Sequence, residues 1–400
     1  MTAKERFLRY VAIDSGSCET SGTHPSSEKQ WDMARLLEKE LTEMGAQDVR
    51  VSPECYVYAS IPANAENQPA IGLIAHMDTA DAVSTGPVHA RCVQYQGGDL
   101  TVGNGAVMRA TEYESLSRHI GHELIVTDGT TLLGGDDKAG IAEIMAACET
   151  VLNDPSIRHG KICIGFTPDE EIGEGANNFD VVGFGADFAY TVDGGIAGEF
   201  ECENFNACTV MVHVHGFNIH PGTAKNKMRN ANRMAAEFVG MMPESETPEH
   251  TELREGFYHL GSIQSDEVNA TLHYIIRDHD RAKFEKRKER IQAVAAYLNG
   301  KYGEGSFQLT LRDTYYNMKE KIDEHPEIID RALNAIRAVG DEPQLVAIRG
   351  GTDGARLSYM GLPCPNMPTG GYNMHGVLEY VSVPEMERIT RALVELVRAR

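Results

Sequence analysis

An acidic pair in a glycine-rich stretch is the first sign of chemistry in this sequence. Asp136 and Asp137 are adjacent within residues 134–140, between a strand-like run and a helix-like run. Two neighbouring carboxylates in an apolar setting repel each other and resist burial, so they need a metal ion or a basic partner such as Lys138. A helix N-terminal cap explains the same residues equally well, because aspartate and glycine are both common there.

Four short apolar runs elsewhere in the chain end in polar residues, as buried strands with functional ends would. The runs and the polar residues after them are 70–75 with His76 and Asp78, 162–167 with Glu170 and Glu171, 188–192 with Asp193, and 345–348 with Arg349. Open α/β sheets carry their sites at the carboxyl ends of the strands. These separate clusters are therefore expected to share one crevice with the acidic pair.

The polar clusters and a histidine in a late glycine-rich loop supply ligands for divalent cations. Two imidazoles and three carboxylates suit a pair of ions bridged by one carboxylate. Zinc is the first choice, and manganese or cobalt are alternatives because the set contains no thiolate. A carboxylate near a histidine ligand can fix its orientation, and an adjacent glutamate can stay free as a general base. The proposed ligands are His76, Asp136, Glu171, Asp193 and His375.

Each of these motifs alone has an ordinary structural explanation. Adjacent glutamates such as Glu170 and Glu171 usually lie on a wet surface. Asp193-Gly194 is foremost a turn signal, and a loop histidine such as His375 is usually not a ligand. The metal-site hypothesis therefore depends on the set as a whole.

Composition and length limit the class of protein. Four hundred residues, 42% of them hydrophobic, predict two globular domains. The formal net charge of -22 argues against nucleic acid as a partner. The eight cysteines contain no Cys-x-x-Cys pair, which fits a reducing cytoplasm. Residues 1–10 resemble a charged helix rather than a signal peptide, and no apolar run reaches membrane-spanning length, so we expect a cytoplasmic protein that binds no membrane.

The hydrophobic pattern changes in the middle of the chain. Continuous apolar runs give way between 207 and 311 to strands that alternate apolar and polar residues, with helices expected at 225–241 and 282–299. The order βαββαβ describes a small inserted domain with one exposed sheet face. We therefore expect a first domain built from 1–206 and 312–400, interrupted by a second at 207–311. The segment 81–123 looks irregular and receives no role.

Six segments resemble a known enzyme family over nearly the whole chain. They resemble the di-zinc exopeptidases that include aminoacylase, succinyl-diaminopimelate desuccinylase and glutamate carboxypeptidase, and within these the tripeptide aminopeptidases. The matching segments are 76–79, 134–140, 167–171, 190–195, 218–224 and 348–354. The resemblance implies an α/β fold: a mixed-sheet catalytic domain with an inserted ferredoxin-like lid domain. One departure, Ala80-Asp81 after the first segment, affects a loop beside the site rather than a ligand.

The resemblance also assigns roles to individual residues. Asp136 would bridge two zinc ions, and a cis peptide would follow it. Asp78 would orient the first histidine, and Glu170 would be the general base. The remaining ligands would divide into His76 and Asp193 on one ion and Glu171 and His375 on the other.

Three residues are candidates for binding the substrate. His220, in the inserted domain, resembles a lid histidine that stabilises the tetrahedral oxyanion, in a homodimer formed through that domain. Arg277 and Arg349 could grip the carboxylate of a short peptide, as arginine does with two hydrogen bonds, or could form structural ion pairs.

The function implied is removal of the N-terminal residue from tripeptides by a metal-dependent aminopeptidase. A dipeptidase or an N-acyl amino acid hydrolase with the same centre is the alternative within the family. A metal-dependent peptide-binding protein without catalysis is the alternative outside it. A two-metal phosphoesterase is disfavoured, because the sequence contains no phosphate cradle.

Overall fold

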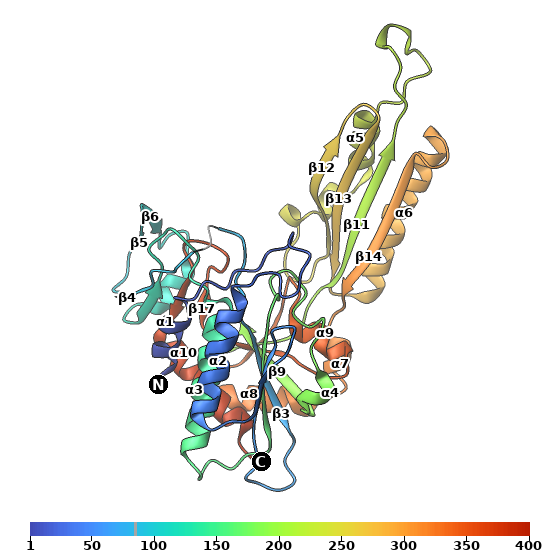
Figure 1. Ribbon diagram of the computed structural model, residues 1–400. Coiled ribbons are helices and arrows are strands. Elements are labelled where there is room, and N and C mark those ends of the chain that lie inside the picture. Colours follow the sequence, from blue (N-terminus) through green and yellow to red (C-terminus); the bar gives the residue numbers. More distant parts are fainter. Residues whose placement is uncertain (84–85) are drawn as a thin grey trace. The chain divides into compact units, whose positions relative to one another are not determined.

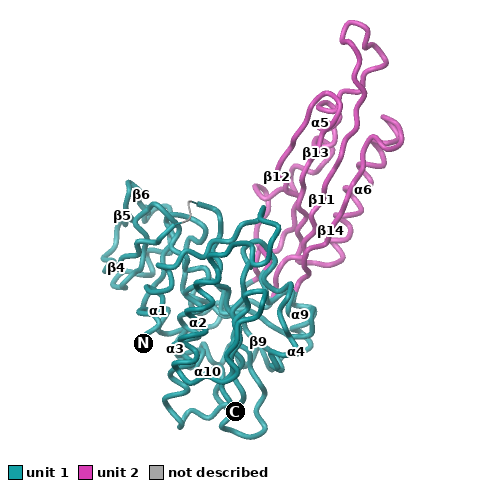
Figure 2. The backbone as a smooth tube through the Cα atoms, viewed as in Figure 1, with its two compact units in different colours: residues 1–202, 318–346, 352–400 teal, residues 203–317, 347–351 magenta. Residues whose placement is uncertain are grey.

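The computed structural model describes residues 1–83 and 86–400. Residues 84 and 85, part of the segment to which the sequence gives no role, lie outside the described residues. The chain forms two compact units, shown in separate colours in Figure 2. Unit 1 contains residues 1–202, 318–346 and 352–400, and unit 2 contains residues 203–317 and 347–351.

The core of unit 1 is a mixed eight-stranded sheet. Strands β3 (Ile71–His76), β8 (Ile162–Thr167) and β9 (Phe188–Gly194) run parallel at its centre. They are almost entirely apolar because both faces of this part of the sheet are covered. The strand order is β1 (Gln47–Val51), β2 (Val57–Ile61), β8, β3, β9, β16 (Asn366–Pro368), β10 (Glu199–Glu203) and β15 (Gln344–Ala347).

Helix α3 (Gly135–Asn153) lies in the middle of unit 1 (Figure 1). It contacts β3 and β9 on one side and α1 (Ala3–Tyr10) and α10 (Val383–Val397) on the other. A helix that is covered on these sides is expected to be largely apolar, and every residue from Asp137 to Cys148 is buried. Further helices of this unit are α2 (Gln30–Met44), α4 (Val181–Phe184), α7 (Lys319–Ile322), α8 (Pro326–Ala338) and α9 (Asp353–Tyr359).

A second, smaller sheet in unit 1 contradicts the expectation of an irregular segment at 81–123. Its strands are β17 (Gly371–Tyr372), β18 (Tyr380–Ser382), β7 (Glu123–Val126) and β4 (Arg91–Gln94). A hairpin of β5 (Leu100–Gly103) and β6 (Ala106–Met108) and the 3-10 helix η1 (Glu114–His119) complete the region. The strands have two to four residues each, too few to show an alternating pattern.

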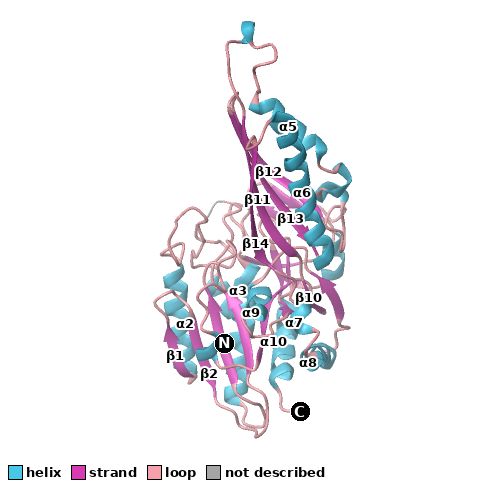
Figure 3. Ribbon diagram, turned by 90° about the vertical axis from the view of Figure 1, so that its right-hand side faces the viewer, coloured by secondary structure: helices cyan, strands magenta, loops and turns pink. Residues whose placement is uncertain are grey.

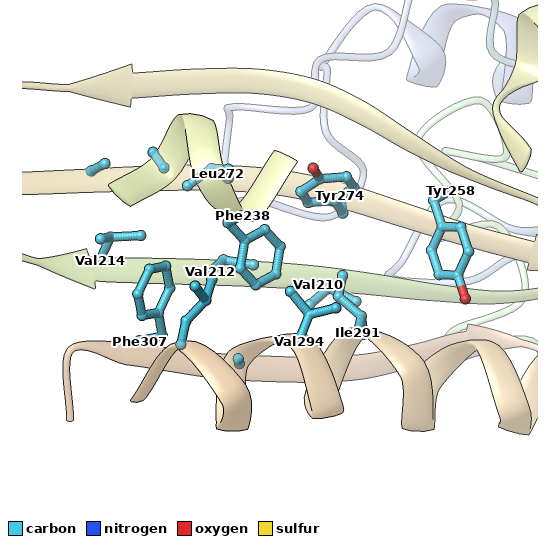
Figure 4. Close-up of a cluster of buried hydrophobic side chains, with 14 of the residues drawn as sticks. Val210, Val212, Val214, Phe238, Tyr258, Leu272, Tyr274, Ile291, Val294 and Phe307 are labelled. Atoms are coloured by element: carbon cyan, nitrogen blue, oxygen red, sulfur yellow. The ribbon is translucent and has the colours of Figure 1, made fainter. Parts of the chain in front are cut away.

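Unit 2 is an antiparallel four-stranded sheet with two helices on one face (Figure 3). Its strand order is β12 (Phe257–Ser265), β13 (Asn269–Asp278), β11 (Asn206–His215) and β14 (Phe307–Tyr315). Alternate residues of β11, including Val210, Val212 and Val214, pack against Phe238 of α5 (Ala231–Met241) and against α6 (Arg281–Tyr302) (Figure 4). The predicted order βαββαβ is correct.

Two details of the expected elements are wrong. Helix α5 begins at Ala231 rather than at Lys225, because Asn226 takes a positive φ of 59° and Asn230 caps the helix by accepting a hydrogen bond from the Arg233 N–H. Strand β15 is not buried: it lies at the edge of the large sheet, and Leu345 is 56% exposed. Its apolar letters alone could not distinguish an edge from a central strand. Across residues 1–83 and 86–400, no helix is long and apolar enough to cross a membrane.

Helix α3 and strand β9 lie so close together at Gly140 that no side chain fits between them, which gives a stability prediction. A Cβ on Gly140 of α3 would lie 1.8 Å from the carbonyl oxygen of Val192 in β9. We expect Gly140→Ala to cost about 2 kcal/mol or more in unfolding free energy, because rigid backbone must move. Gly300→Ala in α6, where no atom lies within 4 Å of the added carbon, is the matched control and should stabilise slightly. Chemical denaturation of the two variants measures the difference, and equal stabilities would contradict the prediction.

Candidate metal centre

Asp136 lies between two histidines that come from opposite ends of the chain. Its Oδ1 atom is 2.7 Å from Nε2 of His76, the last residue of β3. Its Oδ2 atom is 3.1 Å from Nε2 of His375, which lies in the loop between β17 and β18. One carboxylate thus faces one imidazole with each oxygen, which is the arrangement expected of a bridging ligand.

The two remaining predicted ligands lie on either side of this carboxylate. Oδ1 of Asp193, in β9, is 3.5 Å from Nε2 of His76. Oε2 of Glu171, which follows β8, is 3.0 Å from Nε2 of His375. Among the described residues, His76, Asp136 and Glu171 form one group whose ligand atoms all lie within 4.8 Å of one another. The structure therefore brings all five predicted ligands together.

The strands explain why residues so distant in sequence meet. β3 pairs in parallel with β8 and with β9, so the carboxyl ends of the three strands lie side by side. His76 is in register with Thr167, and the two glutamates follow three and four residues after Thr167. Asp136 is added from the start of α3, where its φ and ψ of -85° and 100° are not helical and the bond to Asp137 is cis. The cis bond is the one that the resemblance implied.

Asp137, the other residue of the acidic pair, forms hydrogen bonds with backbone N–H groups. Its carboxylate accepts hydrogen bonds from the N–H groups of His76 and Gly140, both at 3.2 Å. It also lies close enough to His76 and Asp193 to form a second group of potential ligands. Because its oxygens already hold two backbone groups, Asp136 is the better placed of the pair to bind a cation.

Asp78 connects the first histidine to the two glutamates. Its backbone carbonyl is 3.0 Å from Nδ1 of His76. A carbonyl only accepts hydrogen bonds, so Nδ1 carries the proton and Nε2 is left free for a cation. The buried Asp78 carboxylate accepts hydrogen bonds from the backbone N–H groups of Glu170 at 3.0 Å and Glu171 at 3.2 Å. It therefore sets the position of both glutamates.

Burial and neighbouring charges raise the pKa values of several groups in the cluster. Burial raises the pKa of Asp193 to about 7 and that of Glu170 well above its usual range. Hydrogen bonds to Asp136 and Glu171 raise the pKa of His375 to about 11. Burial opposes the charged form of His76, but Asp193 and Asp136 raise its pKa well above the ordinary value. Several carboxylates can therefore stay ionised together here only if positive charge lies beside them.

One buried atom supports a metal ion as the source of that charge. Oε1 of Glu171 is buried and accepts no hydrogen bond from the described residues. An orphaned carboxylate oxygen of this kind costs free energy unless it binds something. Together with two imidazoles whose Nε2 atoms face the same carboxylate, it makes a set of ligands that fits divalent cations.

The three candidate substrate residues all belong to unit 2. His220 is exposed, and its Nδ1 accepts a hydrogen bond from the Gly222 N–H. The Arg277 guanidinium lies over the Tyr315 ring, 5.4 Å from its centroid, and donates to the carbonyl of Ile276.

Arg349 is more fully engaged by its own unit. Its guanidinium donates to the carbonyls of Leu253 and Glu255, at 2.7 and 3.1 Å. It also lies over the rings of Phe205 and Phe257. These contacts hold the chain segment 251–255 against the return segment 347–351.

One residue that contacts the loop of Asp136, Glu379, is not predicted from the sequence. The buried Glu379 carboxylate accepts hydrogen bonds from the loop that carries Asp136. A signal was present, since this glutamate is the only charged residue in the apolar run Val377–Val381, four positions after His375. Only the folded chain shows what it binds.

Comparison with known proteins identifies the family. The chain is 50% identical over 396 residues to peptidase T of Clostridium novyi (strain NT), covering 98% of this chain and 97% of that protein. It is 52% identical over 397 residues to peptidase T of Desulfitobacterium hafniense (strain Y51), with the same coverage. The chain belongs to the peptidase T family. The predicted resemblance is therefore confirmed, and so is the prediction of an enzyme.

Other comparisons agree with the fold. The peptidase dimerisation domain family matches residues 202–306, which lie almost entirely in unit 2. Among solved structures, the aminopeptidase PepT of Bacillus cereus has a TM-score of 0.77 at 22% identity, covering 99% of this chain and 97% of that one. A dinuclear metal binding peptidase of Bacillus subtilis has a TM-score of 0.64 at 13% identity, covering 99% and 96%. The predicted fold class, a mixed-sheet domain with an inserted lid domain, is confirmed.

The raised histidine pKa values predict that metal binding in this peptidase T family member releases protons. The neighbouring carboxylates raise the pKa of both imidazoles, that of His375 to about 11, and a cation binds only an imidazole nitrogen that has lost its proton. Metal affinity should therefore weaken as the pH falls. Calorimetric titration with zinc in buffers of different ionisation enthalpy measures the released protons. His375→Ala should release fewer than the unaltered chain, and equal release would contradict the assignment.

Proposed function

We propose that this protein is a metal-dependent aminopeptidase that releases the N-terminal residue from tripeptides. The single observation that carries the proposal is Asp136 held between His76 and His375, with Glu170 fixed beside them through Asp78. The peptidase T relatives, half identical over nearly the whole chain, support the same activity. The tripeptidase of Staphylococcus aureus, with a TM-score of 0.78 at 20% identity, shares the fold.

The metal centre is proposed to hold two zinc ions, with manganese or cobalt as alternatives. Asp136 would be shared by both ions, with His76 and Asp193 on one side and Glu171 and His375 on the other. Such ions act as Lewis acids that lower the pKa of water and polarise a peptide carbonyl. The pairing of the histidines with different carboxylates, at 3.5 and 3.0 Å, supports this division.

Glu170 is proposed to move the proton. As a carboxylate it takes a proton from the attacking water, and as a carboxylic acid it gives that proton to the amine that leaves. Burial raises the pKa of its carboxyl well above the usual range, which favours proton uptake at neutral pH. Asp78 accepts a hydrogen bond from the Glu170 backbone N–H at 3.0 Å and so fixes the backbone that carries this carboxyl.

Three residues outside the metal centre are proposed to bind the substrate. His220 would stabilise the oxyanion, and Arg277 is the stronger candidate for the peptide carboxylate. Arg349 is the weaker one, because its N–H groups already donate to two carbonyls. The match of residues 202–306 to a dimerisation domain supports a homodimer formed through this unit. A cytoplasmic location remains the expectation from the cysteine pattern.

A pair of substrates tests the proposed activity. A free tripeptide should lose its first residue, and the N-acetylated form of the same peptide should be cleaved at least about tenfold more slowly, because an aminopeptidase must bind the free amine. Chelation should abolish turnover, and added zinc should restore it. A preference for the blocked peptide would replace this activity with that of an N-acyl amino acid hydrolase, and cleavage of dipeptides alone would make the enzyme a dipeptidase.

The role of Glu170 gives a separate prediction. Glu170→Gln keeps the shape of the side chain but cannot accept the proton, so kcat should fall by about 10²–10⁴-fold. Metal content should stay unchanged, since the residue is not a proposed ligand. Glu174→Gln, in the same loop, is the matched control and should keep normal kcat. Full activity in Glu170→Gln would remove the residue from the mechanism, and metal loss would make it a ligand.

A further inference from the structure

A single buried carboxylate accepts hydrogen bonds from the backbone of the loop that leads to Asp136. Glu379, only 1% exposed, accepts hydrogen bonds from four consecutive N–H groups. One oxygen serves the first two groups and the other oxygen serves the last two. The distances are 2.7 Å from Leu133 and 2.9 Å from Gly134 to Oε2, and 2.6 Å from Gly135 and 3.2 Å from Asp136 to Oε1.

The geometry around this carboxylate leaves little room for change. Gly134 has a φ of 79°, a left-handed conformation that turns its N–H toward the same anion as its neighbours. A Cβ on Gly135 would lie 2.9 Å from Oε1 of Glu379 and 2.9 Å from Cγ2 of Val381. A fully buried carboxylate is costly unless N–H groups surround it, and here the loop supplies them.

Glu379 also belongs to the loop that carries His375. Its own backbone N–H donates to the carbonyl of Gly376 at 3.2 Å, which closes the turn directly after the histidine. It lies next to the first residue of β18, so the small sheet anchors it. One residue thus contacts both the loop of Asp136 and the loop of His375, which are about 240 positions apart along the chain.

We propose that Glu379 is a positioning residue that holds these two loops together and so sets the metal affinity of the centre. This inference rests on the proposed metal centre. The histidine and the aspartate face each other at 3.1 Å only if both loops keep their places. Without the carboxylate, four buried N–H groups lose their acceptor, and the loop before Asp136 moves to find water or other partners.

Glu379→Gln tests the proposal with the least change of shape. The amide oxygen can still accept two of the four hydrogen bonds, but the NH2 group cannot accept the other two. We expect the dissociation constant for zinc, measured by equilibrium dialysis against a competing chelator, to rise by about 10–100-fold. The kcat should return to near the normal value at saturating zinc, because no ligand and no proton-transfer group has been removed.

Glu40→Gln is the matched control. Glu40 is also a buried glutamate, but it accepts a hydrogen bond from the Tyr10 hydroxyl at 2.6 Å and pairs with Arg6 rather than with the loop of Asp136. Its substitution should leave the zinc dissociation constant unchanged. If Glu379→Gln only lowers the melting temperature of the metal-free protein and binds zinc normally, the positioning role is overturned.

Two further variants keep the result interpretable. Asp136→Asn alters a proposed ligand itself, and normal zinc binding by this variant would overturn the metal centre rather than the role of Glu379. If Glu379→Gln does not fold, Gly135→Ala replaces it, since the added carbon pushes on the same carboxylate from the loop side. Weaker zinc binding by Gly135→Ala supports the proposal, and unchanged binding overturns it.

Discussion

The repulsion among buried carboxylates around Asp136 is the constraint on which the rest of unit 1 depends. Asp193 and Glu171 interact with it directly, Glu170 interacts with both of them, and burial raises the pKa of each of these three. Such a cluster is stable only where positive charge and N–H groups oppose its charge. The two histidines, the backbone and the proposed cations supply these. The neighbouring elements hold these groups in reach of one another.

The positions of the ligands follow from a division between rigid strands and fastened loops. His76 and Asp193 lie on parallel neighbours in the large sheet, so strand pairing alone brings them together. Asp136 and His375 lie on loops, which have no such pairing. Each loop therefore needs contacts of its own, and Glu379 contacts both. Because some of the proposed ligands lie on loops, the centre is rigid only if hydrogen bonds hold those loops against the sheets.

The sequence located the proposed ligands because their positions obey a simple rule. Buried strands are visible as apolar runs, and polar residues at their carboxyl ends are visible as interruptions, as at His76 and Asp193. The small sheet containing β4 and β7 was missed because its strands are too short for a pattern. Glu379 was missed because its partners are backbone N–H groups, and almost every residue type has one, so the sequence does not show which of them it binds. Arg349 was a candidate for binding the substrate because its loop resembles a site, and only the structure shows that its N–H groups donate to the carbonyls of Leu253 and Glu255.

Backbone conformations around the centre show the same dependence on residues that are not ligands. Asp169, just before the two glutamates, has a φ of 59°, which costs a non-glycine residue about 1 kcal/mol. Its buried carboxylate accepts hydrogen bonds from the Ser26 N–H at 2.8 Å and from Nε2 of Gln30 at 2.6 Å. These contacts offset the strain and fix the turn that aims Glu170. His375 itself has a φ of 60°, and its hydrogen bond to Asp136 holds it there. The chain therefore adopts unfavourable local conformations where the centre requires them, and long-range polar contacts stabilise them.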